Sequence, residues 1–142
     1  MSRKLASRIF PLVWLVIFSG CSGEKPKIYI ADVKAVETKL FFPAISFFMT
    51  IHNRGTGKDV LVSARIKEFP SAKVELHDVV DDRMAKIDKI EILNGKTIQL
   101  KPGSLHLMAF KVKKPTDELT LVLRFKESGD LEVKASLPPK PS

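Results

Sequence analysis

The sequence is poor in the residues that most metal clusters and redox sites require. Its 142 residues include one cysteine and three histidines. A cysteine-based zinc finger, an iron–sulfur cluster and a disulfide framework all need more cysteines, so these are excluded. The sequence also has no glycine-rich phosphate loop and no GxSxG motif. What remains is an ordinary mixture, 44% apolar and 28% charged, at a length that suits one globular domain.

The first 20 residues have the pattern of a secretory signal. A basic segment (residues 3–8) precedes an apolar run (residues 9–18) and two small residues. About ten apolar residues are too few to span a bilayer, which favours a signal peptide over a membrane helix. The position of Cys21 directly after Phe-Ser-Gly resembles a bacterial lipobox, in which the cysteine is diacylated and becomes the new N-terminus. A plain signal peptide beside an unrelated cysteine is the alternative.

Composition divides the chain into four parts. We expect a lipoprotein signal peptide over residues 1–20, a lipidated tether over 21–27, a β-domain over 28–136 and a disordered tail over 137–142. Removal of the signal peptide takes away three of the 24 basic residues and none of the 16 acidic ones, which lowers the formal charge from +8 to +5. The remaining lysines are scattered and lack interleaved aromatic residues, so a solvated surface is favoured over nucleic-acid binding.

Between the tether and the tail, apolar residues recur with period two, which indicates strands. Asn94-Gly95 lies between two such runs and predicts a β-hairpin. No stretch has the period of an amphipathic helix. We therefore expect an all-β fold, a sandwich or barrel of about eight or nine mostly antiparallel strands. The predicted strands occupy residues 27–36, 45–51, 60–66, 72–80, 90–93, 97–100, 104–112, 119–125 and 131–135.

Four side chains with nitrogen or sulfur donors lie near predicted turns: His77, Met84, His106 and Met108. Residues two apart in a strand point the same way, so His106 and Met108 should face away from the core side that Leu107 occupies. His77 should also face outward, and Met84 lies in a polar stretch with no obvious core to join. Each residue alone is more often a solvated histidine or a core-filling methionine. Together, two imidazoles and two thioethers suit Cu(I) better than zinc, magnesium or calcium.

Two other polar features are interpreted as surface residues. His52 ends a strand beside a glycine-containing turn and is expected to be solvated, with an accessory metal ligand as the alternative. Asp78, Asp81 and Asp82 lie close to His77 in the sequence. A calcium loop would need more regular spacing and a glycine, so we expect these carboxylates to be solvated.

The spacing of the four donors resembles that of the PCu(A)C family of periplasmic copper chaperones. Six residues separate His77 from Met84, and 21 residues separate Met84 from the His106-Leu107-Met108 motif. The segment 94–108 (NGKTIQLKPGSLHLM) resembles the most recognisable stretch of the family, and residues 119–133 resemble its closing strands. The gap after His77 is shorter than is usual in the family. Met84 therefore either reaches the metal through a tighter hairpin or falls short of it.

The resemblance implies a cupredoxin-like domain that binds one Cu(I) through His77, Met84, His106 and Met108. It further implies a monomeric carrier in the bacterial periplasm, anchored through Cys21. Such a carrier would hand copper to an envelope protein, such as a cytochrome c oxidase subunit or another copper chaperone.

The residues themselves leave a second function open. A metal-free lipoprotein could dock another envelope protein through the phenylalanine-rich stretch 40–48, although that stretch also suits the core. We do not expect an enzyme. No nucleophile–base pair is evident, and four protein ligands would leave a metal no open position for substrate.

Overall fold

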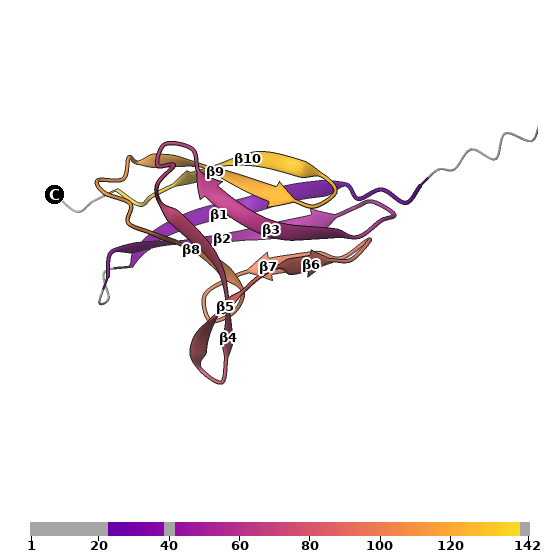
Figure 1. The fold of residues 1–142 in the computed structure, drawn as a ribbon, viewed down its shortest axis with the longest axis horizontal. Helices are drawn as coiled ribbons and strands as arrows, with labels where there is room; N and C mark the ends of the chain where they lie inside the picture. The colour runs from indigo at the N-terminus through magenta and orange to yellow at the C-terminus, as the bar shows by residue number, and fades with distance from the viewer. Residues whose placement is uncertain (1–22, 39–41, 140–142) are drawn as a thin grey trace, which may run out of the picture.

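A computed structural model describes residues 23–38 and 42–139 of the chain. The predicted signal peptide, Cys21 and part of the phenylalanine-rich stretch lie outside the described residues. Within them, no helix has the length and apolarity that a membrane span needs. The described residues form ten strands (Figure 1): β1 (Ile28–Thr38), β2 (Ala44–Asn53), β3 (Asp59–Ile66), β4 (Lys73–Val80), β5 (Arg83–Ile87), β6 (Ile90–Ile92), β7 (Thr97–Leu100), β8 (His106–Phe110), β9 (Glu118–Phe125) and β10 (Gly129–Ser136).

The strands form two sheets that pack against each other (Figure 1). The larger sheet has the order β1-β2-β8-β4-β5, with β7 also paired to β2. The smaller sheet has the order β10-β9-β3-β6. Every strand pair is antiparallel. The predicted all-β, antiparallel fold is confirmed, with ten strands in place of the expected eight or nine.

The core lies between the two sheets and consists of alternate residues of the central strands. Phe47, Met49 and Ile51 of β2 and Leu121 and Leu123 of β9 are at most 2% exposed. Their spacing is the period of two that the sequence displays, because successive side chains in a strand point to opposite faces. Burial of each of these side chains contributes roughly 1.5–3 kcal/mol. The opposite face of the larger sheet is therefore left to the outward-facing residues, among which the candidate donors lie.

The turn at Asn94-Gly95 forms, but the predicted hairpin does not. Gly95 has a φ of 69°, in the left-handed region that suits glycine. The flanking strands then separate, since β6 pairs with β3 in the smaller sheet and β7 pairs with β2 in the larger one. The hairpin prediction was wrong because the turn carries the chain from one sheet to the other. In this arrangement Ile92 and Leu100, one from each strand, are both buried in the core.

Sequence periodicity did not predict β5. This strand lies at the edge of the larger sheet and pairs only with β4. Its residues are exposed apart from Ile87, which is partly buried, so it lacks the alternation that identifies a strand. A two-residue turn, Asp81-Asp82, joins it to β4 with φ values of 50° and 58°. Positive φ at both central residues is typical of the type I′ turns that close tight hairpins. The β4–β5 hairpin projects from the body of the molecule in Figure 1.

A buried carboxylate joins the start of β3 to the turn between β9 and β10. Asp59 is 0% exposed, and its Oδ1 accepts hydrogen bonds from the backbone N–H groups of Val60 (2.8 Å) and Glu127 (2.9 Å). Its Oδ2 accepts one from the backbone N–H of Ser128 (3.0 Å). Burial by itself would raise the pKa of Asp59, but these hydrogen bonds hold it below the ordinary aspartate value.

We predict that Asp59→Asn destabilises the domain by about 1–3 kcal/mol at neutral pH, because the amide nitrogen cannot accept the N–H groups that face it. The folded state lowers the pKa, so the carboxylate stabilises the fold above its ordinary value of 3.8 and loses this effect as the pH falls through the lower folded pKa. Urea unfolding should therefore give a smaller difference between wild type and variant in acid. Asp117→Asn, at an exposed position, is the control. Equal stability of the two variants at neutral pH would contradict the role of Asp59.

Candidate metal centre

His77, Met84 and His106 converge on the outward face of the larger sheet. His77 in β4 lies directly opposite His106 in β8, with ring centroids 5.5 Å apart in an edge-on arrangement. The Sδ atom of Met84 lies 3.4 Å from His77 Nδ1 and 3.0 Å from His106 Nε2. Three of the four predicted donors therefore meet at one point.

Met84 reaches the two histidines through the tight β4–β5 hairpin. The hairpin pairs Met84 with Val79, and directly opposed residues project to the same face of a sheet. Val79 shares its face with His77, two residues earlier in β4. The short gap between His77 and Met84 left two outcomes open: a tighter hairpin that brings Met84 to the histidines, or a methionine that falls short of them. The structure has the tighter hairpin, because the sulfur of Met84 lies beside both rings.

Met108 lies one residue pair further along the same face. It sits opposite Glu75 of β4 and Ser46 of β2, and it shares its face with His106. Its position places it beside the cluster, while the other three donors already touch one another. Methionine has three flexible side-chain torsions, so its sulfur can be directed at a ligand from this position.

Three of the four outward-facing donors are buried, which the sequence did not predict. His77 and Met108 are 7% exposed and His106 is 5% exposed, although all three point away from the side that Leu107 occupies. Two aromatic rings contribute to this shielding: the centroid of Phe48 lies 6.3 Å from that of His106, and the centroid of Phe110 lies 6.1 Å from that of His77. The predicted direction of the His106 and Met108 side chains is confirmed, and neighbouring aromatic rings help to bury the donors on that face.

Hydrogen bonds determine which nitrogen of each imidazole is available. His106 Nδ1 lies 2.8 Å from the carbonyl oxygen of Ser104, which can only accept, so Nδ1 carries the proton. His77 Nε2 lies 2.9 Å from Glu75 Oε2, and an ionised carboxylate also only accepts. In the neutral rings, His106 Nε2 and His77 Nδ1 therefore hold the lone pairs. These are the two atoms that face Met84 Sδ.

Glu75 stays ionised because cations surround it. Its Oε1 lies 2.6 Å from Lys73 Nζ and 3.8 Å from Lys86 Nζ. Hydrogen bonds from Lys73 and His77 lower the pKa of Glu75 to about 2. A carboxylate bonded to the distal nitrogen of a ligating histidine orients the ring and raises its basicity. Glu75 is therefore in the place where such a supporting residue is needed.

Comparison with known proteins supports the same fold. The LpqE-like family model, whose description names a lipoprotein, matches residues 42–137. The chain belongs to the LpqE-like family. No curated protein sequence matches it.

Among solved structures, this LpqE-like chain is similar to the copper-bound PCuAC domain from PmoF2, with a TM-score of 0.68 and 18% identity over 83% of this chain and 99% of that one. It is also similar to the apo PCuAC domain from PmoF1, with a TM-score of 0.66 and 22% identity over 83% of this chain and all of that one. At these identities the likeness shows the fold. The sequence resemblance to the PCu(A)C family is thus confirmed at the level of the fold.

The donor set of the LpqE-like chain fits a soft ion. The observed nitrogen–sulfur separations of 3.0 and 3.4 Å approach the spacing of about 3.5 Å between neighbouring ligands of a tetrahedral ion with metal–ligand bonds of about 2.0–2.3 Å. Neutral imidazole and thioether donors favour Cu(I) over hard cations. Among the residues that the structure describes, no cluster of three or more His, Cys, Asp or Glu could hold a metal ion.

The polar residues interpreted as surface lie outside the cluster. The ring nitrogen Nδ1 of His52 is 2.8 Å from Thr97 Oγ1. His52 lies six residues along β2 from Ser46, the neighbour of Met108, so the structure does not bring it to the donors. Asp81 and Asp82 are exposed in the hairpin turn, as expected, whereas Asp78 is half-buried and its Oδ1 accepts a hydrogen bond from the backbone N–H of Val79 at 2.8 Å.

Glu75 and Ser104 were missed as supporting residues at the sequence level. A signal for Glu75 was present, because it precedes His77 by two positions and so shares its face. No comparable signal existed for Ser104, since its backbone carbonyl makes the contact. Only the path of the turn before β8 aims that carbonyl at the ring.

We predict opposite tautomers for the two rings of the metal-free protein at neutral pH. Long-range ¹H–¹⁵N spectra should show the proton on Nε2 of His77 and on Nδ1 of His106. Glu75→Ala should remove the preference at His77 and leave His106 unchanged, because Ser104 is unaffected. Glu91→Ala, which removes an exposed glutamate bonded to Lys89, is the matched control. The same tautomer at both rings would contradict the assignment.

Proposed function

We propose that this chain is an extracytoplasmic copper carrier that holds one Cu(I) ion as cargo through His77, Met84, His106 and Met108. The observation that carries the proposal is the convergence of His77 Nδ1 and His106 Nε2 on Met84 Sδ, at 3.4 and 3.0 Å. The fold supports it, because a solved PCuAC domain of the same fold is described as copper-bound.

The oxidation state follows from the chemistry of the donors. All four donors are neutral, and thioether sulfur prefers the soft Cu(I) ion, whereas Cu(II) favours tetragonal sites of nitrogen and oxygen. The nearest anion is Glu75, which contacts His77 and is 14% exposed at its side chain. Its negative charge offsets part of the positive charge that a bound copper ion brings into this buried face.

The filled coordination positions and the unequal exposure of the four donors favour transport over catalysis. Four protein ligands would fill the coordination positions of Cu(I), so no position is left for a substrate. Met84 is 54% exposed on the edge strand β5, while the other three donors are buried. A partner's ligand can therefore replace Met84 first, and copper can leave through this side.

The proposed location rests on the signal-like N-terminus, and the proposed recipient rests on the resemblance to the PCu(A)C family alone. A lipoprotein signal over residues 1–20 and diacylation of Cys21 would place the β-domain of residues 28–136 in the bacterial periplasm on a membrane anchor. The family description, which names a lipoprotein, supports the anchor. The recipient is a copper-receiving envelope protein, either a cytochrome c oxidase subunit or another copper chaperone. The mature chain acts as a monomer and has no nucleic-acid partner.

The alternative of a metal-free docking module has less support. The predicted docking surface of such a module is the phenylalanine-rich stretch 40–48. The described residues of this stretch are largely buried. Ile45 and Phe47 are at most 3% exposed, and Phe48 is partly buried beside His106. Phe42, at 74% exposed, and the exposed Pro43 are the exceptions.

We predict that the copper-free, reduced mature chain binds one Cu(I) ion tightly in competition with a colorimetric chelator. His106→Ala and Met108→Ala should each weaken Cu(I) binding by about 100-fold or more, because each removes a ligand. Loss of a supporting residue costs less, about 10–100-fold. Glu75→Ala should weaken it by about 10–100-fold.

His52→Ala is the matched control, because this histidine lies outside the cluster, and it should bind like the wild type. Far-ultraviolet circular dichroism should show that every variant keeps the fold. Wild-type affinity for Cu(I) in both His106→Ala and Met108→Ala would contradict the proposal.

A further inference from the structure

The segment before β1 is held on the loop between β2 and β3. The backbone N–H groups of Arg54 and Thr56 donate to the carbonyls of Lys27 and Lys25, at 2.8 and 2.9 Å. The approach is so close that a Cβ atom on Gly55 would collide with the Lys25 carbonyl. These contacts make the segment part of the folded domain.

Little chain then remains between this fixed segment and Cys21. Only Ser22 and Gly23 separate Cys21 from Glu24. A fully extended chain covers at most about 3.6 Å per residue, so the span is about 11 Å at most. A lipid on Cys21 would therefore hold this end of the domain against the membrane surface. We call it the anchor end: residues 24–27, the loop 54–58 and the turn 93–96.

The anchor end is rich in exposed cations. Within the described residues none of the following forms an ion pair: Lys25, Lys27, Arg54, Lys58 and Lys96. The nearby acidic side chains are Glu24, the buried Asp59 and Glu91, of which Glu91 is bonded to Lys89 at 3.1 Å. The balance of charge at this end is therefore positive.

An aromatic ring lies among these cations. Tyr29 is 37% exposed, and its ring centroid lies 5.6 Å from Lys27 Nζ and 4.8 Å from Arg54 Cζ. Tyrosine with neighbouring basic side chains is typical of surfaces that sit at the level of lipid headgroups.

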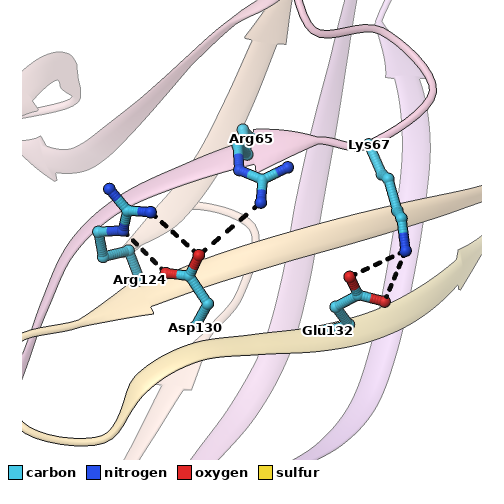
Figure 2. Close-up of polar contacts among 5 residues, drawn as sticks. All are labelled: Arg65, Lys67, Arg124, Asp130 and Glu132. Atoms are coloured by element: carbon cyan, nitrogen blue, oxygen red, sulfur yellow. Dashed lines mark hydrogen bonds and ion pairs between the residues drawn. The ribbon is translucent and has the colours of Figure 1, made fainter.

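The outer face of the smaller sheet has cations of a different kind. Figure 2 shows Arg124 bonded to both oxygens of Asp130, at 2.8 and 3.0 Å, with Arg65 3.7 Å from the same carboxylate. Lys67 is bonded to both oxygens of Glu132, at 3.0 and 3.2 Å. Two carboxylates offset most of the charge of these three cations, so this face offers less net positive charge to an anionic surface than the anchor end does.

We propose that the anchor end docks on anionic lipid headgroups, with Tyr29 at the interface, and that this fixes the orientation of the domain on its membrane. The proposal rests on the lipidation of Cys21 proposed above. The diacylated cysteine would supply the anchor, and an adjacent basic patch, which is attracted to anionic lipid within a Debye length, would set how the domain lies on the surface. In Figure 1 the β4–β5 hairpin points across the long axis of the molecule, whereas the N-terminal segment leaves along it. Docking would therefore leave Met84 open to a partner beside the carrier.

The test uses a tryptophan at the docking position. The only tryptophan of the chain, Trp14, lies in the predicted signal peptide, so Tyr29→Trp would give the mature protein a single reporter. The full chain is expressed with its own signal, extracted in detergent and reconstituted into vesicles of phosphatidylcholine with or without phosphatidylglycerol. With phosphatidylglycerol, the emission should shift to shorter wavelength and brominated lipid should quench it. High salt should reverse both effects.

Two charge-reversal pairs in the reporter background provide the comparison. Lys25→Glu with Arg54→Glu should abolish the shift. Lys113→Glu with Lys114→Glu changes the net charge by the same amount. These two lysines follow the end of β8 that pairs with Ala44, away from the anchor end, so this pair should keep the emission shift. Both pairs should bind Cu(I) like the wild type. Emission that is independent of phosphatidylglycerol, or equal loss in the two pairs, would overturn the docking proposal.

The mass of the mature protein separates this proposal from the copper function. A mature chain without a lipid adduct on Cys21 overturns the anchor and the docking together. The Cu(I) titration is unaffected by that result, because the donors lie in the folded domain.

Discussion

The cross-strand pair of His77 in β4 and His106 in β8 is the contact on which the candidate copper centre depends. Its register is fixed from the other side of the sheet, where Leu76 and Leu107 lie opposite each other and are at most 4% exposed in the core. A slip of one residue in either strand would turn the imidazole of that strand into the core and its leucine outward. The hydrophobic core therefore positions the metal donors although it does not contain them.

Around this pair, short-range contacts prepare the atoms that would hold the ion. Glu75 and the carbonyl of Ser104 each accept a hydrogen bond from the protonated nitrogen of one ring. The unprotonated nitrogens are therefore the ones that face Met84. The two supports differ in kind, since one is a charged side chain held by lysines and the other is a neutral backbone group. The exposed Met84 completes an arrangement in which the other three donors are buried and one side is open to solvent.

The sequence predicted those features that depend on local pattern. Period two gave the all-β fold and the outward direction of His106 and Met108, and the spacing of the donors identified them as a set. Features that depend on contacts between strands far apart in the sequence were not predicted. The Asn94-Gly95 turn has local hairpin chemistry, yet the core draws its two strands into different sheets. The edge strand β5 needs no apolar alternation, and the burial of the donors involves Phe48 from another strand.

The proposed carrier holds one Cu(I) ion through two imidazole nitrogens and two thioether sulfurs. X-ray absorption of the copper-loaded mature chain tests this ligand set most directly, because the edge reports the oxidation state and the extended fine structure separates nitrogen from sulfur neighbours. We predict a Cu(I) edge with both shells present, and loss of part of the sulfur shell in Met84→Leu. A spectrum with nitrogen and oxygen neighbours alone, or one unchanged in Met84→Leu, would contradict the account.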